Sequence, residues 1–222
     1  IAIFTGEDVA ADGIGGPICG WVVTNRDGSP TNEPPHPILA NGTARYVGDH
    51  VAAVIAETLE QAMNAAELVE IEYEVLSPVV DLANAGSGPQ IHENVPGNIY
   101  FDFELGDEEA TAAALDSAAT LVELEVRNNR LIPNAMEPRA ALAEYDPIND
   151  SYTLFTTSQN PHLTRLVIGA FMLNIPESKL RVVAPDVGGG FGSKIYVYPE
   201  EAVCTWACKK VLRPIKWTAD RS

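Results

Sequence analysis

Residues 180–210 read LRVVAPDVGGGFGSKIYVYPEEAVCTWACKK, which places a run of glycines between two regular patterns. The apolar run at 180–184 is typical of a buried strand, and the apolar spacing over 200–210 predicts a helix. Three consecutive glycines, then Phe191 and Gly192, leave a backbone with almost no side chains around its amides. An anionic or strongly accepting group could therefore approach these N–H donors directly.

The glycine run by itself is equally consistent with a tightly turned or flexible connection from strand to helix. It does not form Gly-x-Gly-x-x-Gly after a first strand, and no Gly-Lys-Ser or Gly-Lys-Thr follows at the spacing of a P-loop. The pattern therefore disfavours dinucleotide binding and nucleotide hydrolysis, and it leaves the kind of ligand open.

The segments around this unit predict a mixed α/β arrangement, of the α+β class. The first part of the chain predicts a strand at 51–56, a helix that begins with the capping box Thr58–Gln61 and continues to Glu67, and an alternating strand at 70–76. The later part predicts helices at 107–115 and 161–173 and strands at 121–127, 140–145, 152–157 and 214–218.

Domain organisation is indicated by a shift in composition between Asp81 and Gly97, where Ala, Asn, Gly, Ser and Pro dominate. We expect a linker at 83–96 that separates a domain at 1–82 from a domain at 97–222. The chain begins in strand-like sequence and ends without a closing element. We therefore expect it to be an internal part of a longer polypeptide.

Charge is distributed unevenly along the chain, whose net charge is −17. Residues 1–125 contain 22 acidic residues and two basic ones, whereas residues 126–222 contain 9 acidic and 12 basic residues. An acidic first part would repel nucleic acid and anionic lipid, because both bind through Lys and Arg. The simplest interpretation is a solvated acidic surface, and the composition indicates no nucleic-acid partner.

The apolar runs and the cysteines indicate the cellular compartment of the protein. No apolar run approaches the ~20 residues of a membrane span, and the first residues lack the basic start of a signal peptide. Cys19, Cys204 and Cys208 form no Cys-x-x-Cys pair, so neither a disulfide framework nor a zinc site is expected. Cys204 and Cys208 are four apart on a predicted helix and are expected to be small core residues. A reducing cytoplasm fits this usage best.

Two further motifs, read together with the glycine run, narrow the function that the glycine run predicts. They are Thr-Thr-Ser-Gln-Asn-Pro-His at 156–162 and Asn-Arg-Leu-Ile-Pro-Asn-Ala-Met-Glu-Pro-Arg at 129–139. In this order the three motifs resemble the large subunits of the xanthine dehydrogenase, aldehyde oxidase and aerobic carbon monoxide dehydrogenase family. The resemblance covers nearly the whole chain. It implies a partial hammerhead α/β domain at 1–82, followed by the first part of a molybdopterin-binding α/β domain at 97–222.

The resemblance implies a cofactor site. The residue that matches Gln159 lies beside the apical oxygen of molybdenum in that family, where its amide can donate a hydrogen bond. The amides of the loop, at Gly189, Gly190, Phe191 and Gly192, would approach the cofactor, while no residue of the segment ligates the metal directly. The Phe191 ring would flank the substrate channel. The ordinary alternatives are a polar cap at a strand end before Pro161 for Gln159 and a core side chain for Phe191.

Three further residues in or next to these motifs can be compared with the family: Glu137, Lys194 and Ile195. Glu137 matches an acid near the cofactor region, but an ion pair with Arg139 or Arg130 is at least as good an explanation, so Glu137 stays outside the catalytic set. Lys194 has a counterpart in many members of the family. Family members that oxidise xanthine place a carboxylate directly after this lysine, whereas this chain has Ile195, an aliphatic substrate-channel residue that cannot hydrogen-bond a purine.

The implied activity belongs to a longer protein. It would be a molybdenum-dependent oxidoreductase, a hydroxylase of the carbon monoxide dehydrogenase or aldehyde oxidase type, that oxidises a small substrate with oxygen from water. The implied cofactor is molybdenum-molybdopterin in its cytosine dinucleotide form. The implied partners are an iron-sulfur small subunit and an FAD medium subunit in a dimer of heterotrimers. The general-base glutamate would lie beyond Ser222, so we expect the 222 residues alone to be inactive.

A non-catalytic module that binds a nucleotide or a partner peptide through the glycine run is the alternative function. It explains the glycines but not Gln159. An active-site loop and a late glutamate in the sequence that follows Ser222 would favour the hydroxylase, and their absence would favour the module.

Overall fold

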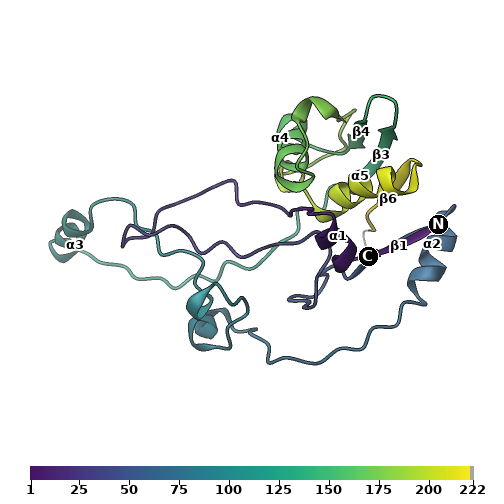
Figure 1. Cartoon of the computed structure of the whole chain (residues 1–222). Coiled ribbons are helices and arrows are strands. Elements are labelled where there is room, and N and C mark those ends of the chain that lie inside the picture. The colour runs from purple at the N-terminus through teal and green to yellow at the C-terminus, as the bar shows by residue number, and fades with distance from the viewer. Residues whose placement is uncertain (221–222) are drawn as a thin grey trace. The chain divides into compact units, whose positions relative to one another are not determined.

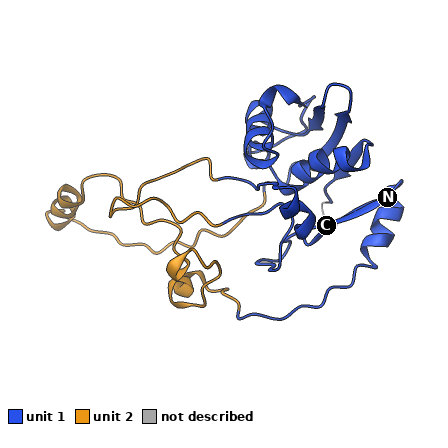
Figure 2. Ribbon diagram, viewed as in Figure 1, with its two compact units in different colours: residues 1–18, 35–77, 133–222 blue, residues 19–34, 78–132 orange. Residues whose placement is uncertain are grey.

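The structure is a computed structural model that describes residues 1–220. It contains two compact units, each assembled from segments that are distant in the sequence (Figure 2). Unit 1 consists of residues 1–18, 35–77 and 133–222, of which the last two are not described, and unit 2 consists of residues 19–34 and 78–132. No helix in the described residues is both long enough and apolar enough to cross a membrane.

Unit 1 is built on a four-stranded sheet with the order β5-β4-β3-β6 (Figure 1). The strands are β3 (Ala140–Asp146), β4 (Ser151–Thr156), β5 (Leu180–Val183) and β6 (Ile215–Thr218). Strands β3 and β4 form an antiparallel hairpin in which Ala143 pairs with Leu154, while β4 and β5 are parallel. Ala143 and Leu154 are fully buried, because alternate residues of each strand face the core.

Helices beside this sheet complete the core of unit 1 (Figure 1). A parallel pair of strands needs a crossover, and here it contains α4 (Pro161–Leu166), a π-helical turn η3 (Val167–Met172) and a 3-10 turn η4 (Glu177–Lys179). Helix α5 (Pro199–Val211) supplies a buried face to the same core, formed by Ala202, Cys204, Thr205, Trp206, Ala207 and Cys208. The buried position predicted for Cys204 and Cys208 is confirmed, and burial raises the pKa of each thiol to about 12.

A small two-stranded sheet also belongs to unit 1. Strand β1 (Ala2–Thr5) pairs antiparallel with β2 (Ala52–Ile55), and helices α1 (Gly6–Ala11) and α2 (Leu59–Ala66) follow the two strands. Half of the predicted capping box is confirmed, because the Thr58 side chain accepts a hydrogen bond from the Gln61 backbone amide at 3.2 Å, whereas no described contact runs from the Gln61 side chain back to Thr58. Phe4 packs against Trp206 of α5 with ring centroids 4.8 Å apart, which joins this part to the main core.

Two predicted strands are absent from the structure. Residues 70–76 and 121–127 are in no strand, and no described segment pairs with either of them. Their alternating side chains are exposed instead; Tyr73 is 60% and Val75 90% exposed. Alternation indicates which face of a strand would be buried, but a strand forms only where a second strand accepts its backbone hydrogen bonds.

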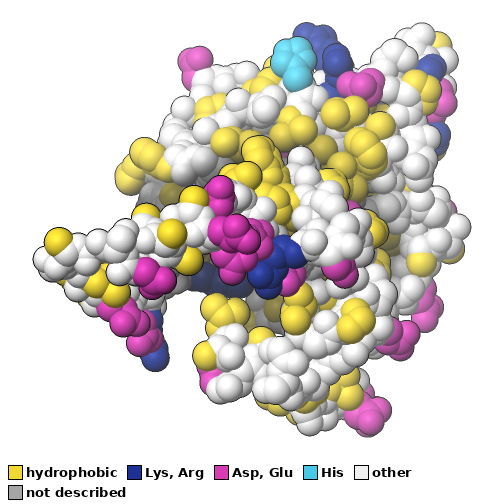
Figure 3. All heavy atoms as spheres, turned by 90° about the vertical axis from the view of Figure 1, so that its left-hand side faces the viewer, with side chains coloured by type: hydrophobic (Ala, Val, Ile, Leu, Met, Phe, Trp, Pro, Cys, Tyr) yellow, Lys and Arg dark blue, Asp and Glu magenta, His cyan; other side chains and the backbone are white. Residues whose placement is uncertain are grey.

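Unit 2 has little regular structure. It contains the 3-10 turns η1 (Leu82–Ser87) and η2 (Pro96–Asn98) and the helix α3 (Glu108–Asp116), which Asp107 caps by accepting a hydrogen bond from the Ala110 amide. Apolar side chains lie at the surface among acidic ones on the face drawn in Figure 3. Residues 83–96, predicted as a linker, lie within this unit, and a domain boundary there stays a prediction.

Candidate functional site

The loop at 188–194, here called the glycine loop, follows β5 and has an unusual backbone. Gly189 has φ = 97° and Gly192 has φ = 89°, in the left-handed region that favours glycine. Phe191 is also left-handed, with φ = 49°, which costs a residue with a side chain about 1–2 kcal/mol. Strain of this kind persists where the surrounding contacts hold it, and it is concentrated at functional sites.

The amides of the glycine loop fall into two groups. Gly188 N donates to Glu137 Oε2 at 2.8 Å, and Gly192 N donates to Gln159 Oε1 at 3.0 Å. The amides of Gly189, Gly190 and Phe191, in contrast, have no hydrogen-bond partner among the described residues. Three consecutive N–H donors are therefore unpaired, the middle one on the buried Gly190.

Gln159 lies directly against this loop. Its backbone amide donates to the Lys194 carbonyl at 2.9 Å, while its Oε1 accepts from Gly192. Because the side-chain oxygen is used by the Gly192 amide, the Nε2 end is left as a donor. Gln159 does not cap α4, because Asn160 is the residue that does so, accepting from the Leu163 amide at 3.3 Å.

Glycine is sterically required at two positions of the loop. A Cβ atom on Gly190 would lie 2.3 Å from Gln159 Oε1, and one on Gly188 would lie 2.7 Å from the Glu137 Cβ atom. Gly192 has no atom within 4 Å of such a position, so only its backbone conformation favours glycine there. The loop and Gln159 thus approach each other more closely than any other residue type would allow.

Glu137 and Lys194 form an ion pair beneath the loop. Lys194 is only 2% exposed, and its Nζ donates to Glu137 Oε2 and to the Glu137 carbonyl, both at 2.8 Å. The hydrogen bond from Lys194 lowers the pKa of Glu137, and the Gly188 amide adds to this effect while burial opposes it. The partner of Glu137 is Lys194 and not Arg139, whose guanidinium lies against the carboxylate of Glu201 instead.

Arg139 holds the far end of the same segment. Its Nη2 donates to the Ser193 carbonyl at 2.6 Å and to the Tyr196 carbonyl at 2.7 Å, and its guanidinium lies 3.4 Å above the Tyr198 ring. Its Nη1 is 3.4 Å from the carboxylate of Glu201, close enough for an ion pair but without the alignment of a hydrogen bond.

Glu201 links this arrangement to the sheet. The side chain is 2% exposed, and it accepts hydrogen bonds from Thr156 Oγ1 at 2.5 Å and from the Tyr198 amide at 2.9 Å. Burial raises the pKa of Glu201, although both hydrogen bonds and Arg139 act in the opposite direction. Arg139, Lys194 and Glu201 were not selected from the sequence as site residues. The sequence signals for two of them were the family counterpart of Lys194 and the position of Arg139 in the motif at 129–139.

Phe191 and Ile195 differ in exposure. Phe191 is 76% exposed, so the interpretation of this ring as a core side chain is wrong. Ile195 is half-buried at the end of the loop. The structure therefore brings together Gln159 and the loop residues selected from the sequence, with the Phe191 ring on the outside.

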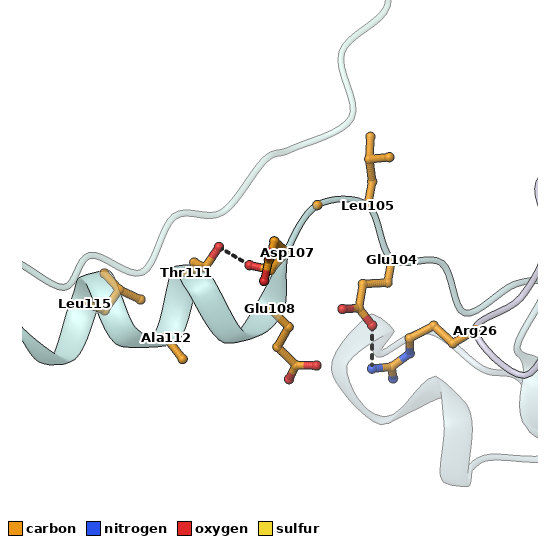
Figure 4. Close-up of a pocket in the computed structure, with 9 residues that line it drawn as sticks. Arg26, Glu104, Leu105, Asp107, Glu108, Thr111, Ala112 and Leu115 are labelled. Atoms are coloured by element: carbon orange, nitrogen blue, oxygen red, sulfur yellow. Dashed lines mark hydrogen bonds and ion pairs between the residues drawn. The ribbon is translucent and has the colours of Figure 1, made fainter.

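Unit 2 contains a separate hollow at the start of α3 (Figure 4). Arg26 lies at its edge, 2.9 Å from Asp102 and 3.6 Å from Glu104, so its charge is compensated. The remaining lining is acidic or apolar, and it includes none of the site residues selected from the sequence. This hollow has no catalytic constellation, and the candidate site is the glycine loop.

Two family models match the chain. The model described as molybdopterin cofactor-binding domain matches residues 91–222, and the model described as aldehyde oxidase and xanthine dehydrogenase, a/b hammerhead domain matches residues 1–77. Together they account for most of the sequence, and the two matches follow each other in chain order.

Relatives of known function resemble the chain along most of its length. The carbon monoxide dehydrogenase large chain of Hydrogenophaga pseudoflava is 36% identical, in a match that covers 83% of this chain and 24% of that protein. The 6-hydroxypseudooxynicotine dehydrogenase complex subunit gamma of Paenarthrobacter nicotinovorans is 38% identical, with 84% and 23% covered. The chain spans about a quarter of the length of these relatives.

A solved structure agrees with this similarity. The crystal structure of quinoline 2-oxidoreductase from Pseudomonas putida 86 superposes with a TM-score of 0.83 and 31% identity. The superposition covers 100% of this chain and 27% of that one. The fold predicted from the sequence, a hammerhead part followed by a molybdopterin-binding part, is confirmed by these matches.

Proposed function

Because the chain belongs to the aldehyde oxidase and xanthine dehydrogenase family of molybdenum hydroxylase large subunits, we propose that its glycine loop and Gln159 form one wall of the cofactor site. The observation that carries the proposal is the set of three unpaired amides at Gly189, Gly190 and Phe191, beside the unpaired Nε2 of Gln159. These four donors come from two segments that are about 30 residues apart in the sequence and are joined by the hydrogen bond from Gly192 to Gln159.

The donors present fit a molybdopterin cofactor. Its metal ligands and pterin carry accepting sulfur and oxygen atoms, and the loop offers unpaired N–H groups on a backbone that is mostly glycine. Among the described residues, no group of three or more His, Cys, Asp or Glu could hold a metal ion. The chain would therefore hold the cofactor by hydrogen bonds to its ligands. When bound, the cofactor would supply two-electron oxidation in which oxygen from water enters the substrate.

Each residue would have a distinct part. The loop amides would bind accepting atoms of the cofactor, and the Nε2 of Gln159 would donate to the acceptor whose charge changes during the reaction. The exposed ring of Phe191 and the side chain of Ile195 would line the substrate channel. Because Ile195 offers no hydrogen bond, a carbon monoxide or aldehyde substrate fits better than a purine.

The whole protein would work as an oxidoreductase with partners. We propose an iron-sulfur small subunit, an FAD medium subunit, the cytosine dinucleotide form of the cofactor and a dimer of heterotrimers in the cytoplasm. Support comes from the relative that is named as a subunit of a dehydrogenase complex. The general base would come from a part of the polypeptide after Ser222.

Metal and pterin analysis of the purified full-length protein, after growth with ample molybdate, tests this function. We expect molybdenum and pterin in stoichiometric amounts. A native protein that lacks both, while binding a nucleotide or a peptide at the glycine loop, would contradict the proposal and favour a non-catalytic module.

A further inference from the structure

The ion pair between Glu137 and Lys194 lies beneath the glycine loop and has no part in the proposed ligand contacts. Its lysine is almost fully buried, unlike the lysine of an ordinary surface ion pair. We propose that Glu137 and Lys194 are positioning residues, whose pair closes the base of the glycine loop and fixes the three unpaired amides for an accepting ligand. The identity of that ligand rests on the proposed function, but the geometry of the loop does not.

One carboxylate oxygen joins the two ends of the loop. Glu137 Oε2 accepts from the Gly188 amide at the first residue and from Lys194 Nζ at the last residue, both at 2.8 Å. The backbone amide of Glu137 also donates to the Gly188 carbonyl at 3.3 Å. The Glu137 segment therefore fixes the separation of the loop ends.

Inside this closure, the Gly192 amide donates to Gln159, and Arg139 donates to the Ser193 carbonyl. The Gly190 carbonyl accepts from the amide and the hydroxyl of Ser193, both at 3.0 Å. The amides of Gly189, Gly190 and Phe191, between the bonded amides of Gly188 and Gly192, stay unpaired. A loop held in this way meets an accepting ligand without first losing conformational entropy, which is the advantage of a preorganised site.

The two partners are unequal in burial, and this makes the inference specific. Lys194 is 2% exposed, whereas the side chain of Glu137 is 31% exposed. Removing the charge of Glu137 leaves a buried ammonium without a counterion, which costs more than the pair contributed. Removing the ammonium leaves a carboxylate that water can reach. We therefore expect Glu137→Gln to disturb the loop more than Lys194→Met.

The chain offers a matched control in the same unit. Arg165 on α4 and Glu177 on η4 form an ion pair with Nε 3.0 Å from Oε2, and both side chains are about two-fifths exposed. Glu177→Gln makes the same chemical change as Glu137→Gln, but at a pair that does not contact the glycine loop. It separates an effect on the loop from a general effect of losing an ion pair.

Hydrogen exchange of the full-length protein, purified after growth without molybdate, tests the inference without any need for activity. We expect Glu137→Gln to speed exchange of the amides of residues 188–196 at least about ten-fold, because the Gly188 amide loses a hydrogen bond to a charged carboxylate. Lys194→Met should have a smaller effect, and Glu177→Gln none. Retained protection of the β3–β4 hairpin at 140–156 shows that the variants fold.

The results separate this inference from the proposed function. If the wild-type protein contains no molybdenum but Glu137→Gln still opens the loop, the positioning role stands and the cofactor assignment is wrong. If the wild-type protein contains molybdenum and both Glu137→Gln and Lys194→Met leave the loop exchange unchanged, the positioning role is overturned. A larger effect of Glu177→Gln than of Glu137→Gln would also overturn it.

Discussion

Gln159 Oε1 accepts a hydrogen bond from the Gly192 amide at 3.0 Å, which turns the donor end of the Gln159 side chain away from that amide. The contact sets the orientation of a side chain whose two ends are chemically opposite. A loop amide thereby determines which end of Gln159 can meet a ligand. Several measurable consequences depend on this orientation.

Replacing Gln159 with Glu tests the accepting atom and the donating atom of this side chain independently. The carboxylate of Gln159→Glu can still accept from the Gly192 amide, but it puts an accepting oxygen where the Nε2 donor was. We expect protection of the loop at 188–196 to be retained while substrate turnover of the full-length enzyme falls about 10²-fold, as for other lost charge-stabilising donors. Gln90→Ala, at a glutamine in unit 2 that bonds only local carbonyls, is the control. Unchanged turnover in Gln159→Glu would contradict the assigned role of Nε2.

Adding one methyl group to Gly190 should displace Gln159. The new Cβ atom would lie 2.3 Å from Gln159 Oε1, so one of the two segments must move, at a cost of about 1–3 kcal/mol. We expect Gly190→Ala to speed exchange of the Gly192 amide and to lower the molybdenum content of the full-length protein. Gly20→Ala, at a glycine with no atom within 4 Å of the added Cβ, should change neither. Equal behaviour of the two variants would refute the close approach.

Loop closure should depend on acid pH in a defined direction. Lys194 lowers the pKa of Glu137 below its ordinary value of 4.5. A carboxyl with a lowered pKa binds its proton less tightly in the folded state, so its contribution is complete above the unfolded pKa and is lost as the pH falls through the folded pKa. Protection of the loop, corrected for intrinsic exchange, should therefore persist at pH 5 and disappear only below pH 4.5.

The same titration distinguishes the partners. In Lys194→Met the pKa of Glu137 should rise, so loop protection should be lost at a higher pH than in the wild type. Glu137→Gln should remove this dependence altogether. Loss of protection at the same pH in all three proteins would show that another carboxyl controls the loop.

The link between α1 and α5 gives a test of the core that is independent of the site. Trp206 Nε1 donates to Asp12 at 2.8 Å, and this bond, with Lys210, lowers the pKa of Asp12. Trp206→Phe keeps the ring that packs on Phe4 but removes the donor. We expect exchange of the α1 and α5 amides to become about ten-fold faster, in line with a hydrogen bond to a charged group. Trp217→Phe, on β6, should leave those amides unchanged.

Local patterns were sufficient to predict much of unit 1. The turn between β3 and β4, the cap at Thr58 and helix α5 depend on residues close together in the sequence, and each is present in the structure. The helix predicted at 161–173 is also present, although its second half is a π-helical turn that closes with Leu173 N bonded to the Ile168 carbonyl at 2.9 Å.

Features that depend on distant partners could not be predicted in the same way. The strands at 70–76 and 121–127 have the right alternation but no described partner, and the two compact units are each assembled from separated segments. The pairing of Glu137 with Lys194 joins residues that are 57 positions apart, so it depends on the tertiary structure and not on a local pattern. The resemblance indicated which residues gather at the site, but the orientation of Gln159 required the Gly192 contact.

The most direct test of the central claim is a comparison of hydrogen exchange in the full-length protein with and without its cofactor. The peptide 188–196 contains the amides of Gly189, Gly190 and Phe191, which have no partner in the structure and should exchange rapidly in the cofactor-free protein. Loading with molybdenum cofactor should slow exchange of this peptide, while helix α3 at 108–116 stays unchanged. A protein that contains molybdenum and pterin but shows no slowing at 188–196 would contradict the account.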